Sequence, residues 1–198
     1  ESGWKLVQSN EEIRRVFHWT SLAMNAQRVA ASAKVRKPND SLSSGQNYVY
    51  EDAPPQSAPD FNASSESLGF GRLDFSNQGY WRPFQLAFLL ASIPPLVDKS
   101  HPKRDLVDII WMPTGGGKTE AYLALAAFTI LWERRQEVLR GEQPSFRVSV
   151  MMRYTLKLLT TQQVLRAAAL ICALEIIRVS NSQLLDASLP KPFRIGAW

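Results

Sequence analysis

The sequence predicts an α/β fold in which a parallel sheet is flanked by helices, and two observations support this prediction. Short apolar runs that suit buried strands alternate with longer segments that suit helices, in the order strand, loop, helix, strand, helix, strand. A glycine-rich stretch, PTGGGKT, joins the first of these strands to the next helix. The chain has 198 residues, 45% of them hydrophobic, which is enough for one packed domain with an appendage.

The N-terminal part predicts one helix over residues 9 to about 34. Ser9 and Glu12 fit the capping-box pattern S-x-x-E, and apolar residues recur after them at roughly helical spacing, namely Ile13, Val16, Phe17, Leu22 and Met24. We therefore treat residues 1–36 as an N-terminal helical segment. Residues 37–79 are rich in Pro, Ser, Asn, Asp and Gly and show no sustained period, which indicates an irregular linker or insertion.

The predicted sheet lies within residues 80–198. Its strands are expected over residues 106–112 and 146–152, with a third beginning at Phe193, and its helices over residues 82–96, 119–135 and 157–179. Pro94 and Pro95 are expected to end the first of these helices. The single cysteine, Cys172, excludes a disulfide framework, favours a reducing compartment and is expected to be a small core residue.

The glycine-rich loop matches the phosphate-binding pattern G-x-x-x-x-G-K-[ST] except at its first position, where Met112 replaces glycine. Three successive glycines can turn backbone N–H groups toward phosphate oxygens, and the following helix adds free N–H groups and the positive end of its dipole. Lys118 can reach the β- and γ-phosphates, and the Thr119 hydroxyl can take one coordination position of Mg²⁺. We predict that ATP contacts Pro113, Thr114, Gly115, Gly116, Gly117, Lys118, Thr119 and Glu120, with Lys118 and Thr119 as the catalytic pair. The alternative is a glycine-rich turn that precedes Lys-Thr by coincidence.

The sequence P-T-G-G-G-K-T-E resembles motif I of superfamily-two helicases and translocases, in which the first position is often not glycine. YWRPFQLAFLL, upstream of it, is similar to the R-x-x-Q element that precedes motif I in that family. The resemblance implies that Gln85 reads the adenine edge with Arg82 in support, since an amide can donate and accept hydrogen bonds at once. Without the resemblance, Gln85 would be expected to be a residue on a helix surface.

The stretch VSVMMRYTLKLLTTQQ resembles motif Ia of the same family. The resemblance implies that the phosphates of one nucleic-acid strand are held by Arg153, Tyr154, Thr155, Lys157 and Gln162. The net charge of the chain is +5, and residues 151–198 contain six basic and two acidic residues, which suits a polyanion. The alternative is a structural strand-to-helix turn with solvated charges.

Three stretches together, RPFQLAFLL, IWMPTGGGKTEAYLALAAFTI and MRYTLKLLTTQQVLRAAALICALE, resemble the helicase of the DISARM antiphage system, the DrmA type. The resemblance runs from about residue 81 to the C-terminus. It implies a RecA-like motor domain that uses ATP and Mg²⁺, acts on DNA rather than RNA, and works beside a second DISARM subunit. The apolar runs are too short to span a bilayer and the N-terminus lacks a signal-peptide layout, so a cytoplasmic location without a membrane partner is expected.

Hydrolysis in that family also needs an Asp-Glu motif that holds Mg²⁺ and positions water. No such pair follows the loop, and Glu175 and Asp186 are expected to be surface residues. We therefore expect residues 80–198 to be the N-terminal part of an incomplete motor domain that is inactive by itself. The alternatives are a non-hydrolysing DNA-binding module, which would not need the loop, and another P-loop NTPase such as a kinase, whose lid arginines are not recognisable here.

Overall fold

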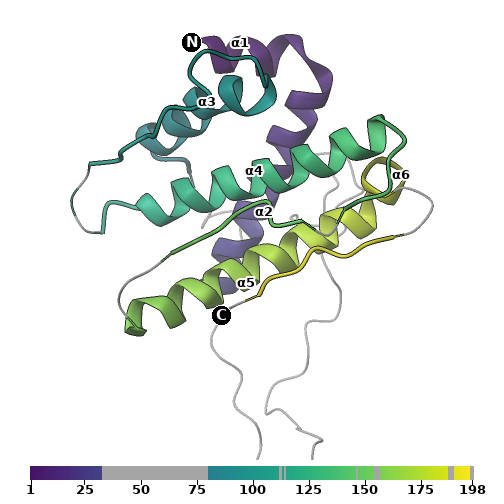
Figure 1. The fold of residues 1–198 in the computed structure, drawn as a ribbon. Coiled ribbons are helices and arrows are strands. Elements are labelled where there is room, and N and C mark those ends of the chain that lie inside the picture. The colour runs from purple at the N-terminus through teal and green to yellow at the C-terminus, as the bar shows by residue number, and fades with distance from the viewer. Residues whose placement is uncertain are drawn as a thin grey trace, which may run out of the picture.

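The structure is a computed structural model that describes residues 1–32, 80–111, 113, 115–145, 147–153, 157–186 and 190–196. These residues form six helices (Figure 1), namely α1 (Ser2–Ser9), α2 (Glu11–Ser32), α3 (Pro83–Val97), α4 (Lys118–Leu139), α5 (Lys157–Ser180) and α6 (Ser182–Leu185). The predicted linker over residues 37–79 lies outside the described residues. None of the helices in the described ranges has the length and apolar character needed to cross a bilayer.

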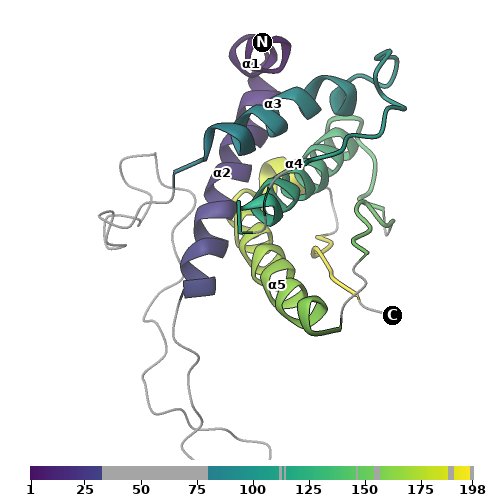
Figure 2. The same ribbon diagram turned by 90° about the vertical axis from the view of Figure 1, so that its left-hand side faces the viewer.

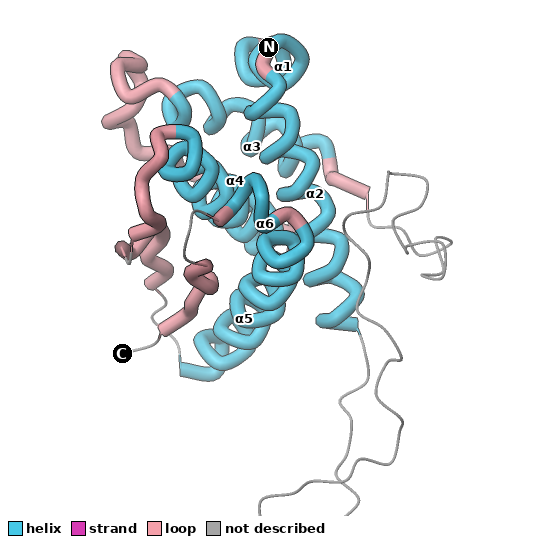
Figure 3. The backbone as a smooth tube through the Cα atoms, turned by 90° about the vertical axis from the view of Figure 1, so that its right-hand side faces the viewer, coloured by secondary structure: helices cyan, strands magenta, loops and turns pink. Residues whose placement is uncertain are grey.

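The predicted parallel sheet is wrong. The described part of the chain contains no strand, and the described residues of the three segments expected to be strands are loops (Figure 3). Val107, Ile109 and Trp111 are 84–93% exposed, whereas a strand inside a parallel sheet would be covered on both faces. A short apolar run satisfies the pattern of a buried strand, but it becomes one only where neighbouring backbone pairs with it and other elements cover it.

Helix α4 lies at the centre of the fold. It contacts α2, α3, α5 and α6, and α2 crosses both α4 and α5 (Figures 1 and 2). Leu123, Phe128 and Leu131 of α4 are fully buried against residues of the other helices, including Val16 of α2 and Leu174 of α5. Each such side chain contributes about 1.5–3 kcal/mol by leaving water. The helix predicted over residues 119–135 is confirmed, and it is longer than expected.

The N-terminal residues form two helices. The second, α2, confirms the helix predicted over residues 9 to about 34, whereas α1 was not predicted and the expected cap at Ser9 is wrong. Ser9 ends α1, and the side chain of Asn10 accepts a hydrogen bond from the Ile13 N–H at 3.1 Å. Asn10 therefore caps α2, as asparagine commonly does, because its oxygen satisfies an N–H that has no partner inside the helix. Glu12 does not serve a capping box with Ser9. Its carboxylate instead pairs with the Arg135 guanidinium of α4 at 2.6 Å, which lowers the pKa of Glu12.

Helix α3 continues through Pro94 and Pro95, which were expected to end it. Pro94 has no N–H to donate to the carbonyl of Leu90, one turn earlier. The buried Gly3 of α1 packs directly against that carbonyl: a Cβ built on Gly3 would lie 1.7 Å from the Leu90 oxygen. The two helices are therefore in contact at a position where only glycine fits.

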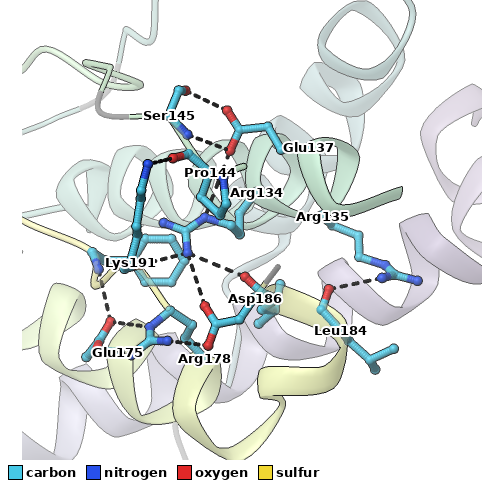
Figure 4. Close-up of polar contacts among 12 residues, drawn as sticks. Arg134, Arg135, Glu137, Pro144, Ser145, Glu175, Arg178, Leu184, Asp186 and Lys191 are labelled. Carbon is cyan, nitrogen blue, oxygen red and sulfur yellow. Dashed lines mark hydrogen bonds and ion pairs between the residues drawn. The ribbon is translucent and has the colours of Figure 1, made fainter. Parts of the chain in front are cut away.

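A network of buried charges joins α4, α5 and α6 to the C-terminal segment (Figure 4). Arg178 donates to Glu175 at 2.5 Å and to Asp186 at 2.5 Å, and Arg134 lies 3.6 Å from Asp186. Hydrogen bonds to Glu175 raise the pKa of Arg178, although burial opposes this shift. Arg134 also lies over the Phe193 ring, 4.6 Å from its centroid. The expectation that Glu175 and Asp186 are surface residues is therefore wrong.

Cys172 is exposed, so the expectation that it is a core residue is also wrong. Its neighbours Ala173 and Leu174 are buried, because they lie on the face of α5 that packs against the rest of the molecule. The sequence AAALICALE is apolar on several sides of the helix and does not by itself indicate which side packs.

Candidate nucleotide-binding site

The glycine-rich loop connects the exposed segment that ends at Trp111 to α4. Gly115 and Gly117 have φ angles of +79° and +87°, in the left-handed region that favours glycine. Gly117 is the N-cap of α4, and the Gly116 N–H donates to the carbonyl of Pro113 at 3.3 Å. The positions with unusual backbone geometry therefore coincide with glycines in the predicted phosphate-binding pattern. Met112 and Thr114 lie outside the described residues.

Two side chains from the start of α3 hold the loop. Arg82 Nη1 donates to the carbonyl of Gly116 at 2.8 Å, and Gln85 Nε2 donates to the carbonyl of Gly117 at 2.8 Å. Gln85 Oε1 accepts from the Arg82 N–H at 3.0 Å, so the same amide also caps α3. Gln85 is 5% exposed. The structure thus brings the R-x-x-Q element onto the loop, and Gln85 is not a surface residue.

These contacts fix the direction of two backbone donors. In a trans peptide the C=O of one residue and the N–H of the next point in opposite directions, and no cis peptide occurs in the described residues. Because the carbonyls of Gly116 and Gly117 face Arg82 and Gln85, the N–H groups of Gly117 and Lys118 point away from these side chains. Both donors lie at the N-terminus of α4, where the helix dipole favours an anion.

The first turn of α4 contains the other predicted site residues. The Lys118 ammonium donates to the carbonyl of Pro113 at 2.8 Å, so it lies over the loop rather than extending into solvent. Thr119 and Glu120 are half-buried. Glu120 forms an ion pair with Arg166 of α5, which links the start of α4 to a second helix.

Packing against Gln85 also requires a glycine in the loop. A Cβ on Gly117 would lie 2.7 Å from Gln85 Nε2, so a larger residue would displace the amide that orients the loop. The residues able to contact phosphate oxygens are Lys118 and the backbone of Gly117 and Lys118. Thr119 offers a hydroxyl for Mg²⁺. The described residues contain no group of three His, Cys, Asp or Glu side chains placed to bind a metal ion.

The predicted nucleic-acid contacts are only partly described. Arg153 and Gln162 are exposed, and Lys157 begins α5, but Tyr154, Thr155 and the Lys157 side chain lie outside what the structure describes. Their role in binding nucleic acid therefore stays a prediction. Part of the basic excess is matched inside the fold, since Arg166 pairs with Glu120 and Arg178 with two carboxylates.

Arg166 is a residue that the sequence analysis missed. It lies four residues after Gln162 on the same helix, which could have suggested a shared face. Its partner Glu120 is distant in the sequence, however, and only the packing of α5 against α4 brings the two charges together.

Comparison with known proteins finds a similarity to DISARM protein DrmA of Bacillus paralicheniformis. The two are 43% identical over 119 residues, which are 60% of this chain and 10% of the relative. The chain therefore spans about a tenth of that relative's length. No family model and no solved structure matches the chain. The similarity supports a DISARM-related identity.

Proposed function

We propose that this chain provides the nucleotide-binding part of an ATP-dependent DNA helicase or translocase in DISARM antiphage defence. The observation that carries the proposal is the orientation of the loop. Arg82 and Gln85 hold two consecutive carbonyls, which leaves the N–H groups of Gly117 and Lys118 directed away from them at the N-terminus of α4. Similarity to DISARM protein DrmA supports the biological setting.

Different groups of the loop would bind the phosphates and the Mg²⁺ ion. Backbone N–H groups and the Lys118 ammonium would neutralise phosphate charge, and the Thr119 hydroxyl would hold Mg²⁺, which supplies further neutralisation when bound. Lys118 already lies over the loop, 2.8 Å from the Pro113 carbonyl, so only a short movement of its flexible side chain would exchange that acceptor for a phosphate oxygen.

The DNA contacts proposed for this protein lie at the start of α5. Arg153 and Gln162 are exposed there, and cations, amides and helix N-termini are common partners of DNA phosphates. We propose a second DISARM subunit as the protein partner, because the relative is named as a protein of that system.

ATP turnover by the full-length protein, with DNA present, tests the proposal. Lys118→Ala should lower turnover by roughly 10²-fold or more, because it removes a charge at the developing phosphate anion. Lys103→Ala is the control, since Lys103 is an exposed lysine in the turns between α3 and the loop. Normal turnover in Lys118→Ala, or an equal loss in both variants, would refute the assignment. ATP binding without any turnover in the unmodified protein would instead favour a non-hydrolysing DNA-binding module.

A further inference from the structure

A cavity of about 300 Å³ lies beside the loop, between α2 and the start of α4. Helix α2 contributes Met24 and Gln27 to its wall, and Trp81 contributes an aromatic side chain. Gln85 and Glu120 line the end next to the loop, since Gln85 also donates to the Gly117 carbonyl. Its volume is at the lower end of the range of small-molecule sites, about 300–1,000 Å³.

The hydrogen bonds of Gln85 join the start of α3 to the loop. Its Oε1 accepts from the Arg82 N–H and its Nε2 donates to the Gly117 carbonyl, so each polar atom already has a backbone partner. A base that took over either bond would release the cap of α3 or the carbonyl that orients the loop. Gln85 is therefore a positioning residue for the phosphate site.

Gln27 offers an amide nitrogen that no backbone group in the described ranges engages. It is 2% exposed, and its Nε2 has no hydrogen-bond partner among the described residues. A buried amide without a partner destabilises the fold, so the fold itself gives no reason for a glutamine at this position. A ligand with a hydrogen-bond acceptor at this wall of the cavity would remove this destabilisation.

We propose that this cavity binds the purine base of the nucleotide, with Gln27 of α2 as the residue that recognises it. The inference rests on the proposed function, because the loop must hold the phosphates for the base to enter here. Gln27 Nε2 donates to an acceptor atom of the base, and the Trp81 ring supplies an aromatic face for stacking. The charges of Glu120 and Arg166 at the cavity offset each other, which suits a neutral ring.

Affinities for ATP and for inorganic tripolyphosphate, measured on the full-length protein, separate the base from the phosphates. Unmodified protein should bind ATP more tightly than tripolyphosphate. Gln27→Leu should weaken ATP binding by roughly 3- to 10-fold, the effect of one lost hydrogen bond, and leave tripolyphosphate binding unchanged. Gln183→Leu, at an exposed glutamine of α6, is the matched control and should change neither affinity.

Gln27→Leu also shows whether Gln27 recognises the base or only stabilises the fold. The melting temperature of nucleotide-free Gln27→Leu should be unchanged or higher, because the substitution removes an amide nitrogen without a partner. Ser21→Phe is a second variant, in case Gln27→Leu does not fold. Ser21 is half-buried on the cavity wall, and a phenyl ring there should weaken ATP but not tripolyphosphate binding.

Each outcome bears on one of the two proposals. If the unmodified protein binds neither ATP nor tripolyphosphate, the proposed function fails and the inference fails with it. If tripolyphosphate binds and ATP binds no more tightly, or if the cavity variants leave ATP affinity unchanged, the inference is overturned while the phosphate site stands. A selective loss of ATP affinity in the cavity variants supports both.

Discussion

Replacing Gly117 with alanine tests whether the loop has the geometry described. Alanine at a φ of +87° costs about 1–2 kcal/mol of backbone strain. Its Cβ would also lie 2.7 Å from Gln85 Nε2, which forces out the amide and removes a hydrogen bond worth about 0.5–1.5 kcal/mol. The expected loss in unfolding free energy is therefore about 1.5–3.5 kcal/mol.

Gly115→Ala is the matched control for Gly117→Ala. Gly115 has a similar φ of +79°, but nothing lies within 4 Å of a Cβ built on it, so this variant should lose only the strain contribution. Urea unfolding of the 198-residue chain measures both. In a Gln85→Ala background, the cost of Gly117→Ala should fall to that of Gly115→Ala, because the displaced amide is already absent. Equal costs for the two glycines in the unmodified chain would refute the packing of Gln85 against the loop.

The remaining predictions concern the buried charges and the DNA contacts. Arg178→Met should lower the unfolding free energy by about 3–5 kcal/mol, because it removes the buried cation that bonds both Glu175 and Asp186. Arg140→Met breaks an exposed ion pair and should lower the unfolding free energy much less in the same urea titration. Burial opposes ionisation of Glu175, but hydrogen bonds from Arg178 and a backbone N–H outweigh it and lower the pKa of Glu175. Its contribution to stability is therefore complete above the unfolded-state pKa and is lost as the pH falls through the folded-state value, so the urea midpoint should fall on acidification below about pH 4.5, and less so in Glu175→Gln. The double variant Arg153→Ala with Lys157→Ala should weaken single-stranded DNA binding and reduce its salt dependence, and an unchanged slope in a salt titration would assign these residues a structural role only.

The sequence predicted the two long helices α4 and α5, within a few residues of their observed ends. Both helices could be predicted because a long run of helix-forming residues without glycine or proline depends on local sequence alone. The family resemblance implied that Arg82 and Gln85 contact the base of the nucleotide, and that role stays a prediction. Their two hydrogen bonds to the loop carbonyls were not predicted from the sequence.

Features that depend on distant partners could not be predicted in the same way. The run that includes Val107 and Ile109 has the composition of a buried strand, yet both side chains are exposed, because composition does not say whether a neighbouring backbone is present. Glu175 and Asp186 looked like surface residues until folding placed Arg178 between them. Nothing in the sequence singles out Gln27, and only the packing around it reveals a buried donor.

The contact between Gly3 and the Leu90 carbonyl has a consequence for how this protein can evolve. Pro94 leaves that carbonyl without its usual donor one turn later, and the missing side chain of Gly3 lets α1 lie directly against it. A larger residue at position 3 becomes acceptable only after the carbonyl has moved, so the effect of one substitution depends on whether another has come first. The order in which mutations arise at the α1–α3 contact therefore decides which of them selection can keep.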